Sequence, residues 1–277
     1  MTAALEPGRV VELTPGVRRL VAPNPGMLTG PGTNSWLLGE REVTVIDPGP
    51  ASETHVEALL AAAAGRLRRV LVTHTHTDHS PAAALLAERT GAELVGRPSP
   101  AGRHQDSSFS PVRVPADGDV LASAEYRLTA LHTPGHASNH VCYLHQGLQW
   151  LFTGDHIIDG STVVIDPPDG DMSAYLESLA RLRELALRAL APGHGNLIPE
   201  PRAAIEKLIA HRLAREARVL AAVRTQPGST PAALVPPAYE GVDPGLFRLA
   251  ERSLLAHLEK LERDGRVGRR DGRWWPA

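Results

Sequence analysis

The sequence lacks the features that would place the protein in a membrane or in an oxidising compartment. It has a single cysteine, Cys142, in 277 residues, which excludes an internal disulfide and is typical of the cytosol. It has no run of about 18 apolar residues, the length that a membrane-spanning helix needs. The first ten residues include Glu6 and Pro7 and have no apolar signal core. We therefore predict a cytoplasmic protein that does not contact a membrane.

Aromatic residues are also scarce, at 4%, and lysine occurs only at Lys207 and Lys260, so arginine supplies nearly all of the 29 basic residues. Hydrophobic residues still make up 42% of the chain, enough for a sizeable core. Strand and helix patterns alternate up to about residue 200, and helical patterns dominate after it. The sequence therefore predicts an α/β protein with two domains, residues 1–201 and 202–277. In the first domain we expect strands at 17–22, 34–38, 43–46, 69–73, 92–95, 126–132, 140–144 and 148–152, and helices at 52–64, 80–90 and 173–188.

The most informative stretch is His-Thr-His-Thr-Asp-His at residues 74–79, which follows an apolar run that predicts a buried strand. His74, His76 and Asp78 alternate along the chain, so extended backbone would point their side chains to the same face. His79 comes just past the predicted strand end. These four side chains are more than one tetrahedral zinc ion takes from a single segment. The spacing therefore indicates a site for two metal ions rather than a polar loop that happens to contain histidine.

Further ligand-type residues lie on turn-prone tripeptides, and the first two of these lie beside predicted strands. His136 follows Thr-Pro-Gly, Asp155 follows Phe-Thr-Gly, and His194 follows Ala-Pro-Gly. Asp47 ends another predicted strand, in Val-Ile-Asp-Pro-Gly. These residues complete the metal site that the first motif begins.

The order of these motifs resembles the metallo-β-lactamase fold superfamily, across roughly residues 10–200. The resemblance implies a four-layer αβ/βα sandwich with metal ligands on loops at one edge. It assigns His74, His76 and His136 to a first metal, Asp78, His79 and His194 to a second, and a bridging role to Asp155. It also implies that Asp47 orients the ligands, and that His140, which follows the His136 turn, contacts the active site.

The ligand set also predicts chemistry. Imidazole and carboxylate ligands suit zinc, our default, and also suit iron or manganese. Two such ions would hold a hydroxide between them at neutral pH and clamp the reacting oxygens. Asp78 would serve as a ligand and as the catalytic acceptor of a hydrogen bond from that hydroxide. Asp155 stands where one common type of β-lactamase has cysteine, and His76 stands where flavodiiron proteins usually have glutamate. Both departures favour a hydrolase outside those groups.

The C-terminal part has the pattern of a winged helix. Predicted helices are followed by a short basic stretch in which Asp271-Gly272 separates two strands, a strong hairpin signal. A metallo-β-lactamase fold followed by a winged helix resembles the branch that contains the lactamase-β-like protein 2 endoribonucleases and polyketide-releasing thioesterases. The segment 28–34, Leu-Thr-Gly-Pro-Gly-Thr-Asn, and Arg212 strengthen this resemblance.

Charge differs between the two predicted domains. Residues 1–201 have 15 basic and 22 acidic residues, whereas residues 202–277 have 14 and 9. The basic wing predicts contacts from Arg269, Arg270 and Arg273 to nucleic acid, with Trp274 and Trp275 stacking on bases. We favour the alternative that the tryptophans pack the wing onto its own domain. The wing would then cover the active site or form a homo-oligomer interface.

Three functions remain open from the sequence. The first is a metal-dependent hydrolase of an ester- or thioester-like small molecule, and the second is an endoribonuclease that cleaves single-stranded RNA. The third is a non-catalytic winged-helix binding protein. The complete set of seven ligands argues against the third function. The acidic first domain disfavours RNA, although the branch resemblance favours it.

Overall fold

The computed structural model describes residues 5–102 and 104–277, which form two compact units. The first unit takes the chain up to Thr133, together with Asn139–Thr162 and Ala186–Pro201. The second takes Pro134–Ser138, Val163–Leu185 and Arg202–Ala277. Each unit is described by itself below.

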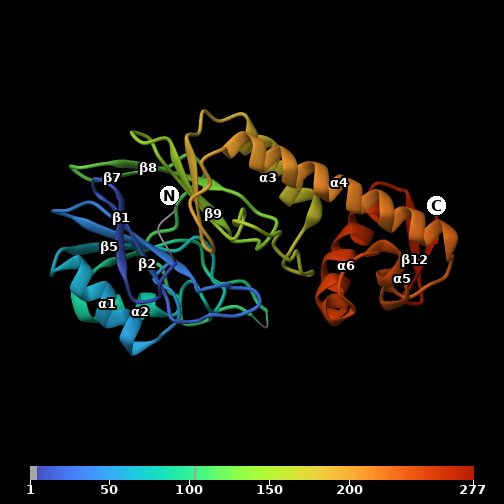
Figure 1. The fold of residues 1–277 in the computed structure, drawn as a ribbon, viewed down its shortest axis with the longest axis horizontal. Helices are drawn as coiled ribbons and strands as arrows, with labels where there is room; N and C mark the ends of the chain where they lie inside the picture. The colour runs from blue at the N-terminus through green and yellow to red at the C-terminus, as the bar shows by residue number, and fades with distance from the viewer. Residues whose placement is uncertain (1–4, 103) are drawn as a thin grey trace. The chain divides into compact units, whose positions relative to one another are not determined.

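The first unit contains two β-sheets (Figure 1). The first sheet has the strand order β1-β2-β3-β4-β5-β6, with β1 Val10–Thr14, β2 Val17–Val21, β3 Asn34–Leu38, β4 Val43–Ile46, β5 Leu67–Leu71 and β6 Glu93–Val95. The second has the order β11-β10-β9-β8-β7, with β7 Val120–Ala122, β8 Arg127–His132, β9 Val141–His145, β10 Trp150–Gly154 and β11 Ala189–Pro192. Parallel pairs, β4 with β5, β5 with β6 and β10 with β11, occur in both sheets.

Helices connect the parallel strands of the first sheet, as parallel pairing requires. The helix α1, Glu53–Ala63, joins β4 to β5, and α2, Ala82–Thr90, joins β5 to β6. Their apolar sides pack on the first sheet through residues such as Leu59 and Val70, both fully buried. Figure 1 shows both helices together along this sheet.

A second apolar layer fills the space between the two sheets. Trp36 on β3 and Phe152 on β10 meet edge to face there, with ring centroids 5.6 Å apart. Residues from both sheets, including Val17, Leu128 and Tyr143, complete this core. The predicted α/β sandwich is therefore confirmed: helices cover one face of the first sheet, and the second sheet covers the other.

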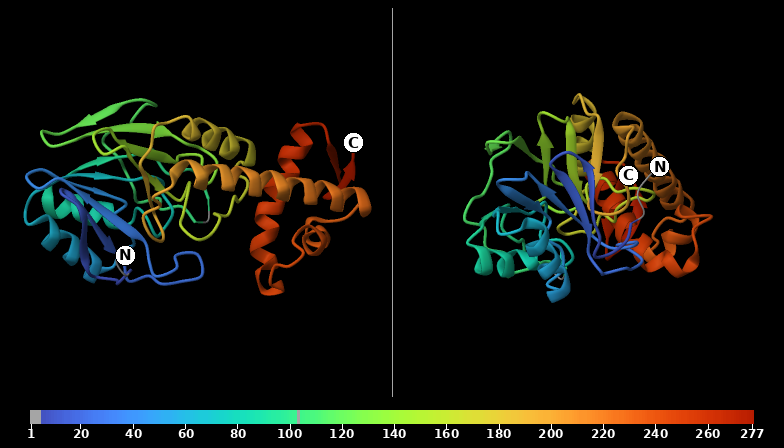
Figure 2. Two further views of the ribbon diagram at one scale, coloured as in Figure 1. Left: turned by 45° about the horizontal axis from the view of Figure 1, so that its top comes forward. Right: turned by 60° about the vertical axis from the view of Figure 1, so that its left-hand side comes forward.

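The second unit contains most of the remaining helices and a small hairpin (Figure 2). Its helices are α3 Met172–Arg183, α4 Pro201–Thr225, α5 Pro231–Ala238 and α6 Phe247–Arg263, with a 3-10 turn at Pro244–Leu246. The strands β12 Val267–Arg270 and β13 Arg273–Pro276 pair antiparallel. Asp271 and Gly272 between them both have positive φ, 50° and 70°, as a tight hairpin turn requires. The predicted winged-helix pattern is present.

Trp274 anchors the wing to the rest of its domain, because its side chain is buried there. Its side chain is 1% exposed and packs in a cluster with Leu254 and Leu258 of α6. The guanidinium of Arg269 lies 5.4 Å from the centre of its ring. For Trp274 the structure therefore agrees with the alternative that we favoured, packing within its own domain, and leaves no exposed face for stacking on bases. Trp275 is 45% exposed.

This difference predicts unequal effects of the two tryptophans on stability. Trp274→Ala empties a closed core site and is expected to lower the free energy of unfolding by about 3–5 kcal/mol. Trp275→Ala removes a half-exposed ring and is expected to cost about 1 kcal/mol or less. Chemical denaturation of the full chain, followed by tryptophan fluorescence and circular dichroism, measures both values. Equal losses in the two variants would contradict the assignment of Trp274 to the core.

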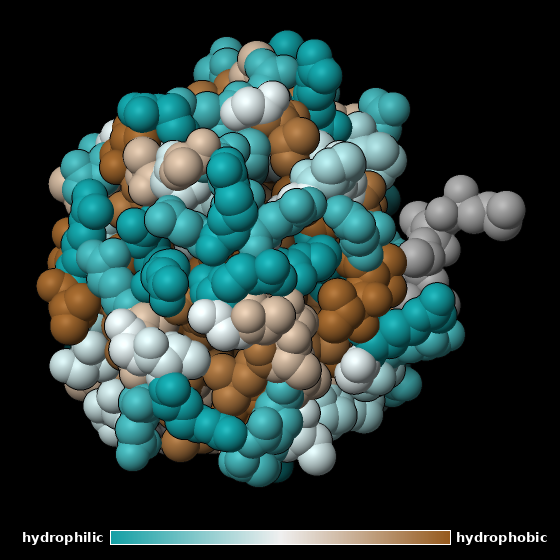
Figure 3. Space-filling view, turned by 90° about the vertical axis from the view of Figure 1, so that its left-hand side faces the viewer, coloured by the Kyte–Doolittle hydropathy of each residue, from teal (hydrophilic) through white to brown (hydrophobic). Residues whose placement is uncertain are grey.

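Hairpin turns gather at one edge of the sandwich. The turns that contain Gly16, Gly39, Glu125 and Gly147 line a hollow of about 350 Å³ there. Figure 3 views the molecule from the side on which β1 and β7 lie in Figure 1, and polar and apolar side chains are interspersed on this face.

In the part of the chain that the structure describes, no helix combines the length and apolarity needed to cross a bilayer.

Candidate metal centre

The predicted ligands of the first unit gather at the edge opposite these hairpin turns. Asp47 follows β4, Asp155 follows β10 and His194 follows β11. The motif at 74–79 follows β5 and forms a turn, in which the amide of His79 donates to the carbonyl of His76 at 2.9 Å. Asp78 therefore does not continue an extended strand, as we had expected, whereas His74 and His76 precede the turn. The side chains converge because the loop turns back on itself.

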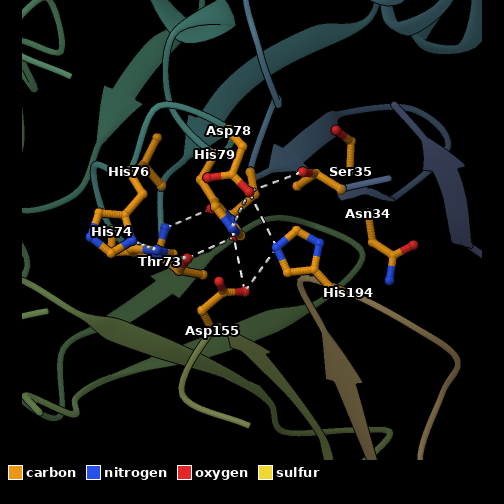
Figure 4. Close-up of polar contacts among 12 residues, drawn as sticks. Asn34, Ser35, Thr73, His74, His76, Asp78, His79, Asp155 and His194 are labelled. Carbon is orange, nitrogen blue, oxygen red and sulfur yellow. Dashed lines mark hydrogen bonds and ion pairs between the residues drawn. The ribbon is translucent and has the colours of Figure 1, made fainter. Parts of the chain in front are cut away.

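Two histidines and two aspartates of this edge have side chains that point toward one another (Figure 4). The Nε2 atom of His79 lies 3.5 Å from Asp78 Oδ2 and 3.4 Å from Asp155 Oδ1. The Nε2 atom of His194 lies 3.2 Å and 3.3 Å from the same two oxygens. Ligand atoms about 2.1 Å from a tetrahedral ion lie about 3.4 Å from one another. The spacing of this group therefore fits one metal ion.

A second group lies directly beside the first. His74 Nε2 is 3.0 Å from His76 Nδ1. His74 also joins His79 and Asp155 in a set of side chains close enough to share an ion. His136 belongs to the segment Pro134–Ser138, which packs in the second unit. Its place beside His74 and His76 therefore stays a prediction.

The carboxylates and imidazoles of the group shift one another's pKa values. Burial would raise the pKa of Asp78, but His79 and His194 outweigh it and lower that pKa to about 2. Burial would likewise lower the pKa of His194, but Asp155 and Asp78 raise it to about 10. Without a metal, protons on the imidazoles neutralise the buried carboxylates. A divalent ion would replace these protons, since metal ligands must be deprotonated.

His79 gives a direct test of whether the residues fit a metal. Its side chain is fully buried, yet among the described residues its Nε2 atom has no hydrogen bond. On the other side of the ring, Nδ1 lies 2.9 Å from Asp47 Oδ2. With the proton on Nδ1, the Nε2 lone pair faces the carboxylates, as a metal ligand requires. The histidines and aspartates at this edge are thus suited to hold metal ions.

Asp47 has the contacts of a residue that orients ligands. It is 1% exposed and adopts a positive φ of 52°, which is unusual outside glycine. Its carboxylate accepts hydrogen bonds from the Thr73 amide at 2.7 Å and from the Thr73 hydroxyl at 2.8 Å, besides that of His79. Asp47 thus joins the start of the ligand loop to one of its imidazoles.

This arrangement predicts a metal-binding defect in Asp47→Asn. The amide keeps the volume of the carboxylate but loses the charge that holds the Nδ1 proton of His79. We expect zinc affinity to fall about 10–100-fold, the usual effect of removing such a partner. Competition with a chelating dye measures the affinity. Glu125→Gln is the control, because Glu125 accepts amide hydrogen bonds from residues 40–42 at the other edge. Equal affinities in wild type and Asp47→Asn would contradict the orienting role.

His140 lies behind the ligands and has no exposed surface. Its ring stacks on that of His74, with centroids 5.1 Å apart and an interplanar angle of 28°. Its Nδ1 atom is 2.9 Å from the Thr133 hydroxyl. His140 therefore packs against a predicted ligand, as we expected of an active-site neighbour.

Sequence reasoning missed the contribution of residues 33 and 34. Thr33 forms an isolated bridge with His194, and its hydroxyl lies 3.4 Å from Asp78 Oδ2. The side-chain amide of Asn34 donates through Nδ2 to the carbonyls of Pro192 and Gly195, on both sides of His194. These residues fix the His194 loop against β3. The segment 28–34 had been noted only as a sign of the branch, and its Gly-Thr-Asn sequence was the available signal.

Comparison with known proteins agrees with this fold and site. The family description "Metallo-beta-lactamase superfamily" matches residues 28–194, and "Beta-lactamase associated winged helix domain" matches residues 230–274. The chain is 30% identical over 274 residues to a Drosophila melanogaster protein described as "Beta-lactamase-like protein 2 homolog", covering 93% of this chain and 91% of the relative. It is 32% identical over 217 residues to an "Atrochrysone carboxyl ACP thioesterase" of Aspergillus fumigatus, covering 76% and 66%.

Solved structures agree over nearly the whole chain. A metallo-beta-lactamase family protein from Thermus thermophilus superposes with a TM-score of 0.81 at 25% identity, covering 96% of this chain and all of that one. A beta-lactamase domain protein from Burkholderia ambifaria gives 0.82 at 25% identity, covering 100% and 95%. The chain therefore belongs to the metallo-beta-lactamase superfamily. It is a metal-dependent hydrolase of that superfamily that also has the associated winged helix domain.

Proposed function

We propose that this protein hydrolyses an ester- or thioester-like carbonyl substrate with the help of two divalent metal ions, with zinc as the default. The observation that carries the proposal is a pair of neighbouring ligand groups. The Nε2 atoms of His79 and His194 each lie 3.2–3.5 Å from an oxygen of Asp78 and of Asp155, and His74 and His76 lie beside them. When bound, two such ions would polarise the carbonyl and lower the pKa of water to about 7. The rest of the chemistry depends on how the chain places its own side chains.

The proposed ligand assignment divides the site into two parts. Asp78, His79 and His194 would hold one ion, and Asp155, which is close to both groups, would bridge. His74 and His76 would hold the other ion together with His136. The ring of His136 supports this assignment, because its Nδ1 lies 2.8 Å from the carbonyl of Val164 and donates to it, as the second ring nitrogen of a metal-binding histidine usually does.

Asp78 is the residue we propose to act in the reaction. Its side chain is 27% exposed, about twice the 13% of Asp155, so its carboxylate is the more accessible to a substrate. As an acceptor it would orient the attacking water toward the carbonyl, while the Thr33 hydroxyl steadies the same carboxylate. Exposure and position thus separate a reacting carboxylate from a bridging one.

The thioester class is supported by the relative from Aspergillus fumigatus, whose printed name is that of an acyl-carrier-protein thioesterase. It is also supported by charge, because residues 1–201 have seven more acidic than basic residues and would repel a polyanion. Zinc-loaded full-length protein should hydrolyse members of a panel of acyl thioesters and aryl esters. Cleavage of single-stranded RNA oligonucleotides with no turnover of any ester would contradict the proposal.

Endoribonuclease activity is the second candidate, favoured by the excess of basic residues in 202–277. Each of the three wing arginines has a partner in its own domain. Arg273 donates to the carbonyl of Gly228 at 2.9 Å, and Arg269 lies over Trp274 and 3.7 Å from Glu262. The Arg270 side chain is 85% exposed beside Asp271. Contact of the wing with nucleic acid, a homo-oligomer and a cytoplasmic location all stay predictions.

A salt titration of RNA binding separates these roles of the wing. If Arg269, Arg270 and Arg273 contact phosphates, binding should weaken steeply with salt, because such contacts release counterions. Replacing all three with glutamine should then weaken binding and flatten the slope. If the wing has a structural role, the same triple variant should bind RNA as the wild type does. We expect the second result.

A further inference from the structure

The predicted ligand His136 is held by a segment without regular structure. We call this segment, residues 163–171, the strap; it carries neither helix nor strand and leads into α3. The strap makes at least three hydrogen bonds with the His136 loop, one of them from the amide of Ser138 to the carboxylate of Asp169 at 3.3 Å. The carbonyl of Val164 accepts from His136 Nδ1 at 2.8 Å, and the amide of Asp171 donates to the carbonyl of Gly135 at 2.8 Å. The position of the strap therefore sets the position and the tautomer of the His136 ring.

Side chains from the C-terminal helices fix the strap on both sides of Val164. Arg212 of α4 donates to the carbonyl of Val163 at 2.5 Å. Ser253 of α6 accepts from the amide of Ile165 at 3.3 Å. The backbone groups next to Val164 are thus tied to α4 and α6, while Val164 itself is tied to His136.

The far end of the strap is fixed in the same way. Arg263 of α6 makes two contacts with the Asp171 carboxylate, at 2.5 Å and 2.9 Å. The same carboxylate caps α3 by accepting from the Ala174 amide. Asp171 thus connects α6 with α3 and with Gly135.

Arg212 is the best placed of these residues to control His136. It is 3% exposed, so its charge is removed from water and depends on its protein partners. Besides Val163, it lies 5.2 Å from the centre of the Tyr175 ring. Tyr175 in turn packs closely against the His136 loop. The backbones are so near that a Cβ added to Gly135 would lie 2.3 Å from Tyr175 Cα. Arg212 therefore contacts both the strap, at Val163, and Tyr175, and each of these packs against the His136 loop.

We infer that the C-terminal helices position a metal ligand, with Arg212 as the positioning residue that holds His136 through the strap. This inference rests on the proposed metal site, in which His136 holds one of the two ions. The C-terminal domain then has a part in metal binding that does not require it to contact a substrate or RNA.

Cobalt binding by the full-length protein tests the inference. Metal-free protein is titrated with Co²⁺, and the visible absorption bands report the number and affinity of the bound ions. Arg212→Ala should keep one tight equivalent and bind the other about 10–100-fold more weakly, as is usual when a partner that orients a ligand is lost. Arg212→Lys, which keeps a donor for Val163, should recover part of that loss.

Arg215→Ala is the matched control. Arg215 also lies on α4, also donates to a backbone carbonyl, that of Ala238, and also lies over a ring, 3.9 Å from the centre of Tyr239. Arg215 has these contacts away from the strap, so Arg215→Ala should bind both equivalents of Co²⁺ as the wild type does. Wild-type cobalt binding by Arg212→Ala, or an equal loss in Arg215→Ala, would overturn the inference.

Two further results keep the test decisive. If Arg212→Ala does not unfold cooperatively, Ser253→Ala and Arg212→Lys decide the question. Selective weakening of one equivalent in both supports the inference, and wild-type binding by both overturns it. If the wild type itself takes up no cobalt or zinc, the proposed function fails. If the wild type binds two ions and all strap variants do too, only the role of Arg212 fails.

Discussion

Replacing Asp78 with alanine is expected to lower kcat by about 10²–10⁴-fold, the range that a positioned acid or base contributes. The effect on KM should be much smaller, because a carboxylate that orients the attacking water acts mainly in the transition state. The structure supports this role through the exposure of the Asp78 side chain and its 3.2 Å approach to His194. Asp78→Asn should give a similar loss in kcat, since an amide is a poorer acceptor and a poorer ligand.

The measurement is steady-state kinetics at saturating zinc, with metal content determined in the same samples. Asp119→Ala is the control, because this carboxylate caps a surface turn by accepting from the Ala116 amide. It should turn over substrate at the wild-type rate. An unchanged kcat with a raised KM in Asp78→Ala would show that Asp78 contributes only to substrate binding.

Removing the metal ions is expected to abolish turnover and to make the first unit less stable. The carboxylates of Asp78 and Asp155 would then have only the imidazoles to neutralise them. Elemental analysis should find about two ions per chain, and zinc added after dialysis against a chelator should restore activity. Full activity with a single equivalent would contradict the bridging role of Asp155.

Metal affinity should also rise with pH. In the metal-free site the pKa of His194 is raised to about 10, so this imidazole is protonated at neutral pH, and the pKa of His79 is raised as well. The pKa of Asp78 is about 2, so its carboxylate stays ionised. Metal binding must therefore displace protons from histidine, and it competes better as the pH rises. Zinc affinity should be higher at pH 8 than at pH 6, with protons released on binding, which calorimetry in buffers of different ionisation enthalpy detects.

The sequence revealed the candidate ligand residues more readily than the shape of the loop that carries them. A motif such as residues 74–79 is local, so its ligand residue types are visible without the fold. The turn that brings His79 back over His76 depends on contacts with Asp47 and Thr73. These partners are separated in sequence by up to 32 residues, so short-range patterns do not reveal them.

The strand β11 shows a different limit. We expected a helix over 173–188, and α3 ends at Arg183, after which Ala189–Pro192 forms a buried strand. Alanine and leucine favour helix when isolated. Here parallel pairing with β10 and burial between neighbours override that preference, as tertiary context often does for short strands. His194 lies at the end of this strand, so its motif was found without the element that positions it.

The division of the chain into two units has a consequence for biosynthesis. Segments 134–138 and 163–185 are synthesised well before 202–277, yet they pack with it in the second unit. A ribosome-bound chain would have the loop of His74 and His79 complete while the strap still lacked Arg212 and Arg263. The second unit therefore cannot be completed until 202–277 has been synthesised, although two of its segments lie between segments of the first unit. Ending translation after Pro201 would leave two internal segments without their packing partners, rather than release an intact first domain.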